Sequence, residues 1–190
     1  MHNALAIWMK ERSALQQGEI DTICSYFKPE IVAQEESLLT EGGRYRKIVF
    51  VVEGILRVFV VDNGGEEIVK NLIEAGQFFS VIESFYDNAP APMNVSAVTG
   101  CQLLTLTKPD ADRLANILPK WEILMKEGAM QAMNEMIRKQ NFLRSGTAAD
   151  QYRHFVEHYP SLARQVPLKY IASYLRITQS SLSRIRKQGW

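Results

Sequence analysis

Apolar residues change their spacing twice along this chain. Close to the N-terminus they recur every three or four residues, which predicts helices over residues 4–15 and 19–27 with Gly18 between them. Between residues 31 and 107 they gather in short runs rich in Val, Ile and Phe, and from Pro109 onward the helical spacing returns. The pattern therefore predicts a β domain that lies between two helical regions.

The central stretch is typical of a β-barrel or a β-sandwich. Its strand-like runs are separated by breaks that contain glycine and asparagine, and Asn63-Gly64 between two runs is a hairpin signal. The predicted strands are residues 47–52, 55–61, 67–73, 95–98 and 102–107. Strands at such regular spacing favour a closed or two-sheet architecture. No glycine-rich loop leads into a helix, which excludes a P-loop and a dinucleotide-binding fingerprint.

One long helix is predicted after Pro119, ending at about Leu143. Its apolar residues form two stripes, which are Met125, Ala129, Ala132, Met136 and Leu143, and Met130, Met133 and Ile137. A helix with two apolar faces must bury both. We expect one face to cover the β domain and the other to pair with the same helix of a second copy. The residues assigned to the dimer interface are Met125, Ala129, Ala132 and Met136. Burial of both faces within one chain is the alternative.

Residues 166–187 are typical of two short helices joined by a tight turn. Pro167 suits the first turn of a helix, where its missing N–H needs no partner. Arg176-Ile177 is the expected turn, with Ile177 as its buried plug, and Thr178 is the expected cap of the second helix. Other positions expected to be buried are Ile171, Ala172, Tyr174, Leu175, Leu182 and Ile185.

The outer face of the second helix has the chemistry of a DNA reader. Arginine donates two hydrogen bonds to guanine, and glutamine pairs in the same way with adenine. The last 25 residues hold five Lys or Arg and no Asp or Glu, which suits a polyanion. The residues assigned to DNA contact are Lys169, Thr178, Gln179, Ser180, Ser183, Arg184 and Lys187. The alternative is a solvated surface helix that ends a domain.

Composition and charge place the basic character at one end of the chain. Hydrophobic residues make up 46% and charged residues 23%, as in ordinary soluble globular proteins. Residues 145–190 carry a net charge of +5, whereas residues 1–144 carry −4. We expect three parts, residues 1–118, 119–145 and 146–190, with a hinge at 145–147. No apolar run reaches membrane-spanning length and no signal-peptide order is present, so a cytoplasmic protein is expected.

Candidate chemistry other than DNA binding is sparse. Two cysteines are too few for a disulfide framework or an iron–sulfur cluster. None of the three histidines lies in the β domain, which argues against a barrel enzyme with a histidine-bound metal. His154 and His158 are four residues apart on a predicted helix, but no carboxylate shares their face. We therefore expect no catalytic residue, no metal and no cofactor.

The order of parts resembles the Crp/Fnr family of transcription regulators. The resemblance covers nearly the whole chain and is carried by residues 51–58, 74–78 and 171–186. It implies an α+β fold: an N-terminal double-stranded β-roll of the cyclic-nucleotide-binding type, a long dimerisation helix and a C-terminal helix-turn-helix domain. In this family the start of the recognition helix and an arginine five residues later read bases, positions that match Gln179, Ser180 and Arg184 here.

Two departures from the family pattern stand out. The family holds cyclic nucleotide with a Gly-Glu pair and an arginine, but these positions fall at Ser80-Val81 and in residues 89–92, and residues 77–94 contain no Lys or Arg. A buried phosphate without a cation is costly, so a usual response to cyclic AMP is not expected. The residues assigned to an effector pocket are Phe79, Ser80, Val81, Ala91 and Pro92. Trp190 follows the second helix closely, so no β-wing is expected after it.

These observations predict a homodimeric, sequence-specific DNA-binding transcription regulator. Its expected partners are operator DNA and a second copy, with RNA polymerase as a further candidate, an unidentified small-molecule effector, and no membrane. The alternative is a ligand-sensing or protein-interaction module whose C-terminal domain does not read DNA. An enzyme built on the β domain is a weaker third possibility.

Overall fold

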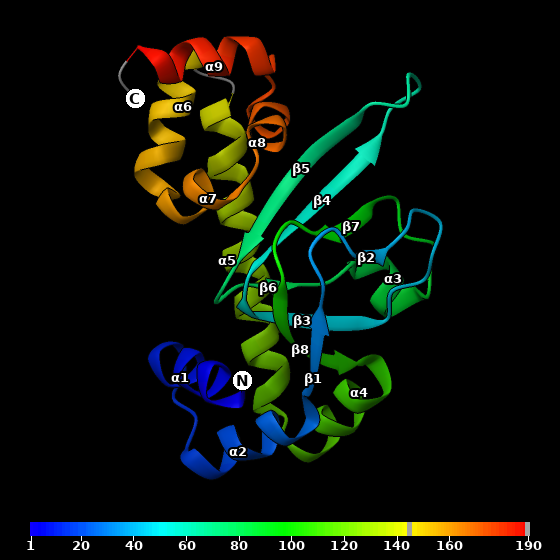
Figure 1. The fold of residues 1–190 in the computed structure, drawn as a ribbon. Coiled ribbons are helices and arrows are strands. Elements are labelled where there is room, and N and C mark those ends of the chain that lie inside the picture. Colours follow the sequence, from blue (N-terminus) through cyan, green and yellow to red (C-terminus); the bar gives the residue numbers. More distant parts are fainter. Residues whose placement is uncertain (144–145, 189–190) are drawn as a thin grey trace.

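The molecule, a computed structural model, combines a β-roll with helical parts at both ends (Figure 1). Residues 1–143 and 146–188 are described, without the side chains at 131, 135 and 138–143, so the expectations placed on Leu143, Ser145 and Trp190 lie outside the described residues. The helices are α1 His2–Arg12, α2 Gln17–Tyr26, α3 Ile82–Asp87, α4 Lys108–Ile117, α5 Lys120–Leu143, α6 Ala148–His158, α7 Pro160–Gln165, α8 Leu168–Leu175 and α9 Gln179–Lys187. The strands are β1 Lys28–Val32, β2 Ser37–Leu39, β3 Lys47–Glu53, β4 Ile55–Val61, β5 Glu67–Glu74, β6 Phe78–Phe79, β7 Asn94–Ala97 and β8 Cys101–Thr107.

Two antiparallel sheets form the roll. One has the strand order β1-β8-β3-β6 and the other β2-β7-β4-β5. The sheets share an apolar interior, to which β3 contributes Val49 and Val51, β4 contributes Leu56, and β8 contributes Leu103. Alternate residues point to opposite faces of a strand, so the residues between these positions must be covered from outside.

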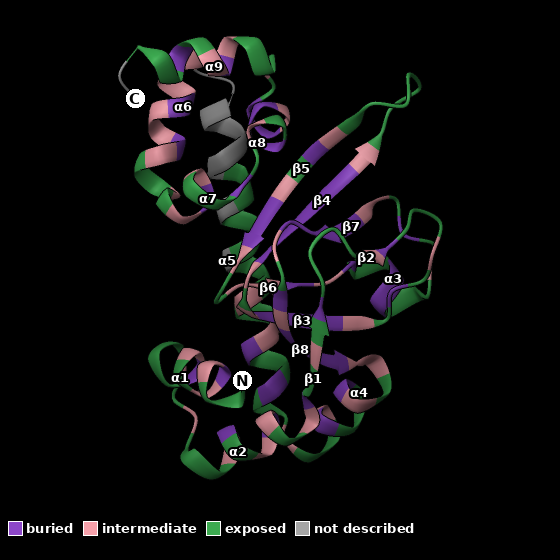
Figure 2. Ribbon diagram, in the orientation of Figure 1, coloured by how far each residue is buried: buried purple, intermediate pink, exposed green. Residues whose placement is uncertain are grey.

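Helices cover the outer face of the first sheet. Ile48 and Phe50 of β3 alternate with the interior residues and pack beside Leu104 of β8 in a second cluster, together with residues of α1, α2, α4 and the start of α5. Figure 2 shows buried residues running along the central strands. Because both faces of this sheet are buried, β3 and β8 have continuous apolar sequences rather than an alternating pattern.

The C-terminal helices cover the outer face of the second sheet. Ile55 of β4 and Val69 and Leu72 of β5 belong to the same apolar cluster as Tyr170 and Ile171 of α8. This cluster also holds the buried residues of α6, α7 and α9. The C-terminal domain therefore shares its core with the roll.

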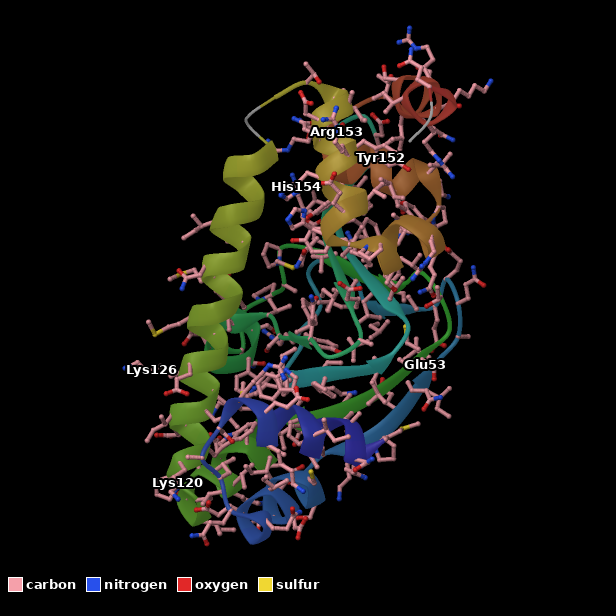
Figure 3. All side chains as sticks on the ribbon, turned by 90° about the vertical axis from the view of Figure 1, so that its left-hand side faces the viewer. Glu53, Lys120, Lys126, Tyr152, Arg153 and His154 are labelled. Carbon is pink, nitrogen blue, oxygen red and sulfur yellow. The ribbon has the colours of Figure 1, made fainter. Side chains whose placement is uncertain are left out.

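Only the N-terminal end of α5 packs against the described core. Trp121 and Leu124 are buried and Met125 is half-buried, whereas the described side chains of both apolar stripes are exposed from Ala129 onward. Figure 3 shows α5 as a rod along one side of the molecule, with Lys126 directed away from it. The expectation that one stripe would cover the roll is therefore met at Met125 alone among the described side chains.

The predicted strands are all present, but short and edge elements were missed. β1, which contains Pro29, was not predicted; proline is tolerated there because β1 is an edge strand. β2, β6, α3 and α7 were also not predicted, because two to six residues are too few to show a period. The Asn63-Gly64 hairpin is confirmed, although Gly65 is the residue with positive φ, at 82°.

The turn between β3 and β4 depends on Gly54. Its φ is +95°, and a Cβ there would lie 2.5 Å from the Gly100 carbonyl oxygen and 2.6 Å from Cys101 Sγ. We expect Gly54→Ala to lower the free energy of unfolding by about 2 kcal/mol or more, because it combines backbone strain with a clash. Chemical denaturation would measure this. Gly18→Ala in α2, where nothing lies within 4 Å of the added carbon, is the matched control and should cost nothing; equal effects would contradict the assignment.

Candidate nucleic-acid interface

The α8–α9 pair is joined by the tight turn that the sequence predicts. Arg176 ends α8 in the left-handed region, with φ 58° and ψ 37°, and the Ile177 N–H donates to the Ala172 carbonyl at 3.0 Å. A residue in the left-handed conformation ends a helix and lets the chain change direction at that position. Two details differ from expectation: Ile177 is half-buried, and Pro167 precedes α8 as its N-cap residue.

Local hydrogen bonds and two buried side chains fix the start of α9. The Thr178 hydroxyl accepts a hydrogen bond from the Ser181 backbone N–H at 3.2 Å, which confirms its predicted role as a cap. Leu182 is fully buried and Ile185 is 8% exposed. The inward face of α9 is therefore held by the domain core, and its opposite face is left to solvent.

The outward face of α9 presents the predicted reading residues. Gln179, Ser180, Arg184 and Lys187 are exposed and Ser183 is half-buried. The Arg184 side chain is exposed, and its Nη2 lies 3.4 Å from the Ser181 hydroxyl. The face is thus polar and basic, with long side chains able to reach several ångströms beyond the helix.

Arg186 was counted in the basic end but not assigned to this face. It is exposed and lies seven residues after Gln179, so it falls on nearly the same side of α9. Its spacing was the signal that could have identified it. Arg186 therefore adds a positive charge at one edge of the outward face, and Arg184 lies at the other edge.

Lys169 lies apart from the other predicted DNA-contacting residues. Its Nζ is 4.6 Å from the centre of the Tyr170 ring, and its charge helps to lower the pKa of Glu67 on β5, after the larger effect of the hydrogen bond from Arg57. Lys169 is therefore on the part of α8 that adjoins the roll. The structure brings together the assigned residues from Thr178 to Lys187 but not this one.

The residues assigned to an effector pocket mostly fill the roll interior. Phe79, Val81 and Ala91 are buried in the interior cluster together with Tyr45, whose burial raises the pKa of its hydroxyl above the ordinary value. The Ser80 hydroxyl donates to the carbonyl of Lys47 at 3.0 Å. Pro92 is exposed at the surface. These residues are thus close in space, but three of them serve as core.

A cation that the sequence analysis missed reaches the segment after α3. Arg44 precedes β3, and its Nε donates to the Asn88 carbonyl at 3.0 Å. Nothing in the local pattern indicates this contact, because 44 residues separate the partners. The segment of residues 77–94 lacks its own Lys or Arg but has this one beside it.

Metal and membrane sites receive no support from the part of the chain that the structure describes. There, no group of three or more His, Cys, Asp or Glu side chains is placed to hold a metal. The rings of His154 and His158 stack at 3.8 Å, and desolvation lowers the pKa of His154. No helix among the described residues has the length and apolar character needed to cross a bilayer.

Comparisons with known proteins agree with this architecture. The family model of the cyclic nucleotide-binding domain matches residues 29–117, and no curated protein matches the chain. FixK2 from Bradyrhizobium japonicum superposes with a TM-score of 0.74 at 14% identity, covering 85% of this chain and 83% of its own. CLP, the c-di-GMP-responsive global regulator of Xanthomonas campestris, gives 0.71 at 14% identity, covering 91% of each chain.

The catabolite activator protein of Thermus thermophilus is a further solved structure of this kind. It gives a TM-score of 0.55 at 20% identity, and the alignment covers 92% of this chain and 84% of that one. At such identities the likeness concerns the fold alone. The resemblance to Crp/Fnr regulators is thus confirmed in the fold, and residues 29–117 match the family model of the cyclic nucleotide-binding domain.

Proposed function

We propose that this chain is a homodimeric transcription regulator that binds specific DNA sequences through α9. The observation that carries the proposal is the outward face of α9, where Gln179, Ser180 and Arg184 are exposed on a helix whose opposite side is buried. Residues 166–190 contain no carboxylate side chain, so no like charge on that segment opposes a phosphate backbone. The Crp/Fnr-like fold supports a regulator rather than an enzyme.

In this proposal α8, the tight turn and α9 act as a helix-turn-helix motif. The first turns of α9 would enter the major groove, while α8 would cross the DNA backbone. Arg184 would donate two hydrogen bonds to a guanine and Gln179 would pair with an adenine. Lys187 and Arg186, nearer the C-terminal end of α9, would contact phosphates and supply affinity without sequence preference.

The exposed apolar side chains of α5 support a dimer. Solvent-exposed fractions of 47–59% are found for Ile123, Met130, Met133, Met136 and Ile137. A row of large apolar residues along one helix is typical of an interface that a second copy covers. Two α9 helices would then meet half-sites about one helical turn of DNA apart. RNA polymerase stays a predicted partner that no described surface identifies.

We also propose that the roll does not hold cyclic AMP in the usual way. Phe79, Val81 and Ala91 occupy the interior with apolar side chains, and residues 77–94 supply no cation. Arg44 adjoins this segment, but its Nε is already bonded to the Asn88 carbonyl. The effector therefore remains unassigned.

The contributions of base recognition and of phosphate contact to DNA binding can be separated by comparing Arg184→Ala with Lys187→Ala. We expect Arg184→Ala to cost about 1–3 kcal/mol on a selected operator and to relax preference at one base pair in each half-site. Lys187→Ala should weaken operator and random DNA alike and lower the salt slope by about one per contact. Titrations of both DNAs across a salt series measure these effects. An unchanged operator-to-random ratio in Arg184→Ala would show that Arg184 is only a phosphate contact.

The dimer can be tested with Met136→Glu, which places a charge in the proposed interface. We expect the variant to sediment as a monomer and to bind the operator weakly, because burying an unpaired carboxylate is costly. Asn116→Glu on α4 adds the same charge at an exposed site outside α5 and should leave the dimer intact. A wild-type monomer at micromolar concentration, or a dimeric Met136→Glu variant, would contradict the assignment.

Cyclic AMP binding can be measured directly by calorimetry. We expect no saturable heat at millimolar nucleotide, because the roll lacks the glutamate and arginine that hold ribose and phosphate in the family pattern. A micromolar dissociation constant would overturn this claim. In that case Arg44→Ala would show whether Arg44 supplies the missing charge.

A further inference from the structure

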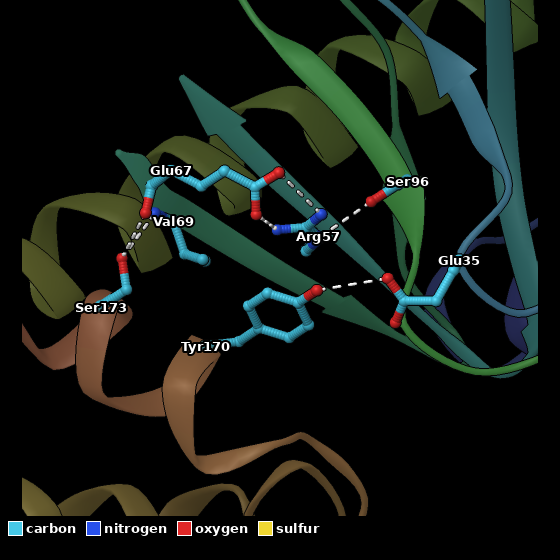
Figure 4. A network of polar contacts seen from close by, with 7 residues as sticks. All are labelled: Glu35, Arg57, Glu67, Val69, Ser96, Tyr170 and Ser173. Atoms are coloured by element: carbon cyan, nitrogen blue, oxygen red, sulfur yellow. Dashed lines mark hydrogen bonds and ion pairs between the residues drawn. The ribbon is translucent and has the colours of Figure 1, made fainter. Parts of the chain in front are cut away.

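Helix α8 docks on the free edge of a sheet. β5 is the outermost strand in the order β2-β7-β4-β5, so its outward N–H and C=O groups have no strand partner there. The Ser173 hydroxyl accepts a hydrogen bond from the Val69 N–H at 2.9 Å and donates to the Glu67 carbonyl at 3.2 Å (Figure 4). One side chain of α8 thereby satisfies two backbone groups of β5, much as a neighbouring strand would.

A buried arginine lies beside this contact. Arg57 of β4 has a side chain only 6% exposed, and its guanidinium pairs with the Glu67 carboxylate through both Nη atoms. Its Nε donates to the Ser96 hydroxyl on β7 at 2.8 Å. The guanidinium carbon lies 4.1 Å from the ring centres of Phe59 and of Tyr170. The cation therefore contacts two strands of the roll and one aromatic ring of α8.

The same aromatic residue connects α8 to the loop between β1 and β2. The Tyr170 hydroxyl lies 3.2 Å from Glu35 Oε2 and donates to it. Glu35 is a non-glycine residue with φ of 63°, a conformation that needs support from its surroundings. Figure 4 shows Ser96 directed to Arg57, and Glu35 joined to Tyr170 of α8.

These contacts hold the roll and α8 in one mutual position. We propose that Arg57, Glu67, Tyr170 and Ser173 form an interdomain clamp that sets the direction of α9 relative to the roll. If α8 moved away, Arg57 would lose one of its two aromatic faces and β5 would lose both hydrogen bonds to Ser173. The clamp therefore has a docked and a released arrangement, and a change in the roll that displaces Arg57 would favour release.

This inference rests on the proposed function, because its consequence is presentation of α9 to DNA. The reading face of α9 stays exposed while α8 is docked, and α9 lies on the side of the domain away from the roll (Figure 1). Gly146, in the middle of the expected hinge, is exposed with φ of 82°. Without the clamp, both C-terminal domains of a dimer would have to be ordered on binding, which reduces affinity. The docked arrangement is thus the one competent to bind.

The Val69 amide gives a readout of docking that does not involve DNA. Its N–H is bonded to Ser173 of α8, so hydrogen exchange at Val69 reports how often the clamp opens. The Val51 N–H donates to the Gln77 carbonyl at 3.0 Å within the roll. Hydrogen exchange at Val51 therefore reports opening of the roll itself and serves as the reference. Exchange in the full chain can be followed by NMR at both positions.

The test compares Arg57→Met with Arg46→Met. Arg57→Met leaves an unbranched apolar side chain and removes the charge and the N–H donors to Glu67 and Ser96. Arg46 is exposed, and Arg46→Met is the matched control. We expect exchange at Val69 to become about tenfold faster in Arg57→Met, as loss of the cation–aromatic and charge contacts predicts, with Val51 unchanged. Affinity for the selected operator should fall only as far as the docked fraction falls, which can be less than the change in exchange. Arg46→Met should change neither.

A second variant keeps the proposal testable if Arg57→Met disturbs the roll and raises exchange at Val51. Glu67→Gln retains the shape of the partly exposed carboxylate but removes its charge, and it should give a smaller increase at Val69 with Val51 unchanged. Unchanged exchange at Val69 in the variants that fold would overturn the clamp. Exchange at Val69 fast enough to show a mainly released α8, with undiminished operator affinity, would overturn its role in presenting α9. If the wild type binds no DNA, the proposed function fails, while exchange at Val69 still decides whether the clamp exists.

Discussion

Burial of both faces of both sheets is the constraint on which this structure depends. Residues of β3 and β4 alternate between the roll interior and an outer apolar face, so each sheet needs a covering layer. The N-terminal helices and the start of α5 cover one sheet, and the C-terminal helices cover the other. The placement of α9 follows from this need, because its domain is held where the second sheet requires apolar cover.

The same constraint explains the unequal surroundings of α5. Trp121 and Leu124 complete the cover of the first sheet, after which the helix runs beyond the sheet it packs against. The apolar residues from Met130 onward then have no described neighbour of their own chain to bury them. The start of α5 thus packs against the core of its own chain, and the later turns of the same helix present an apolar surface.

The outer face of β4 and β5 combines apolar cover with one buried charge. Arg57 lies among Ile55, Val69 and Leu72, where a cation is tolerated only when its donors are paired. Glu67 and Ser96 pair it from the roll, and Tyr170 covers it from α8. The ion pair and the hydrogen bond are complete within the roll, and the Tyr170 ring adds cover only while α8 is docked.

The sequence by itself determined the elements whose signals are local. The five predicted strands, the long helix, the turn at Arg176 and the cap at Thr178 each depend on residues a few positions apart, and the outward face of α9 follows from its period. Tertiary structure alone decided the partners of Arg57, Arg44 and Lys169, and the filling of the expected pocket. Asn88 is 44 residues from Arg44, and Glu67, Ser96 and Tyr170 are 10, 39 and 113 residues from Arg57, so the folded chain rather than a short-range pattern brings these partners together.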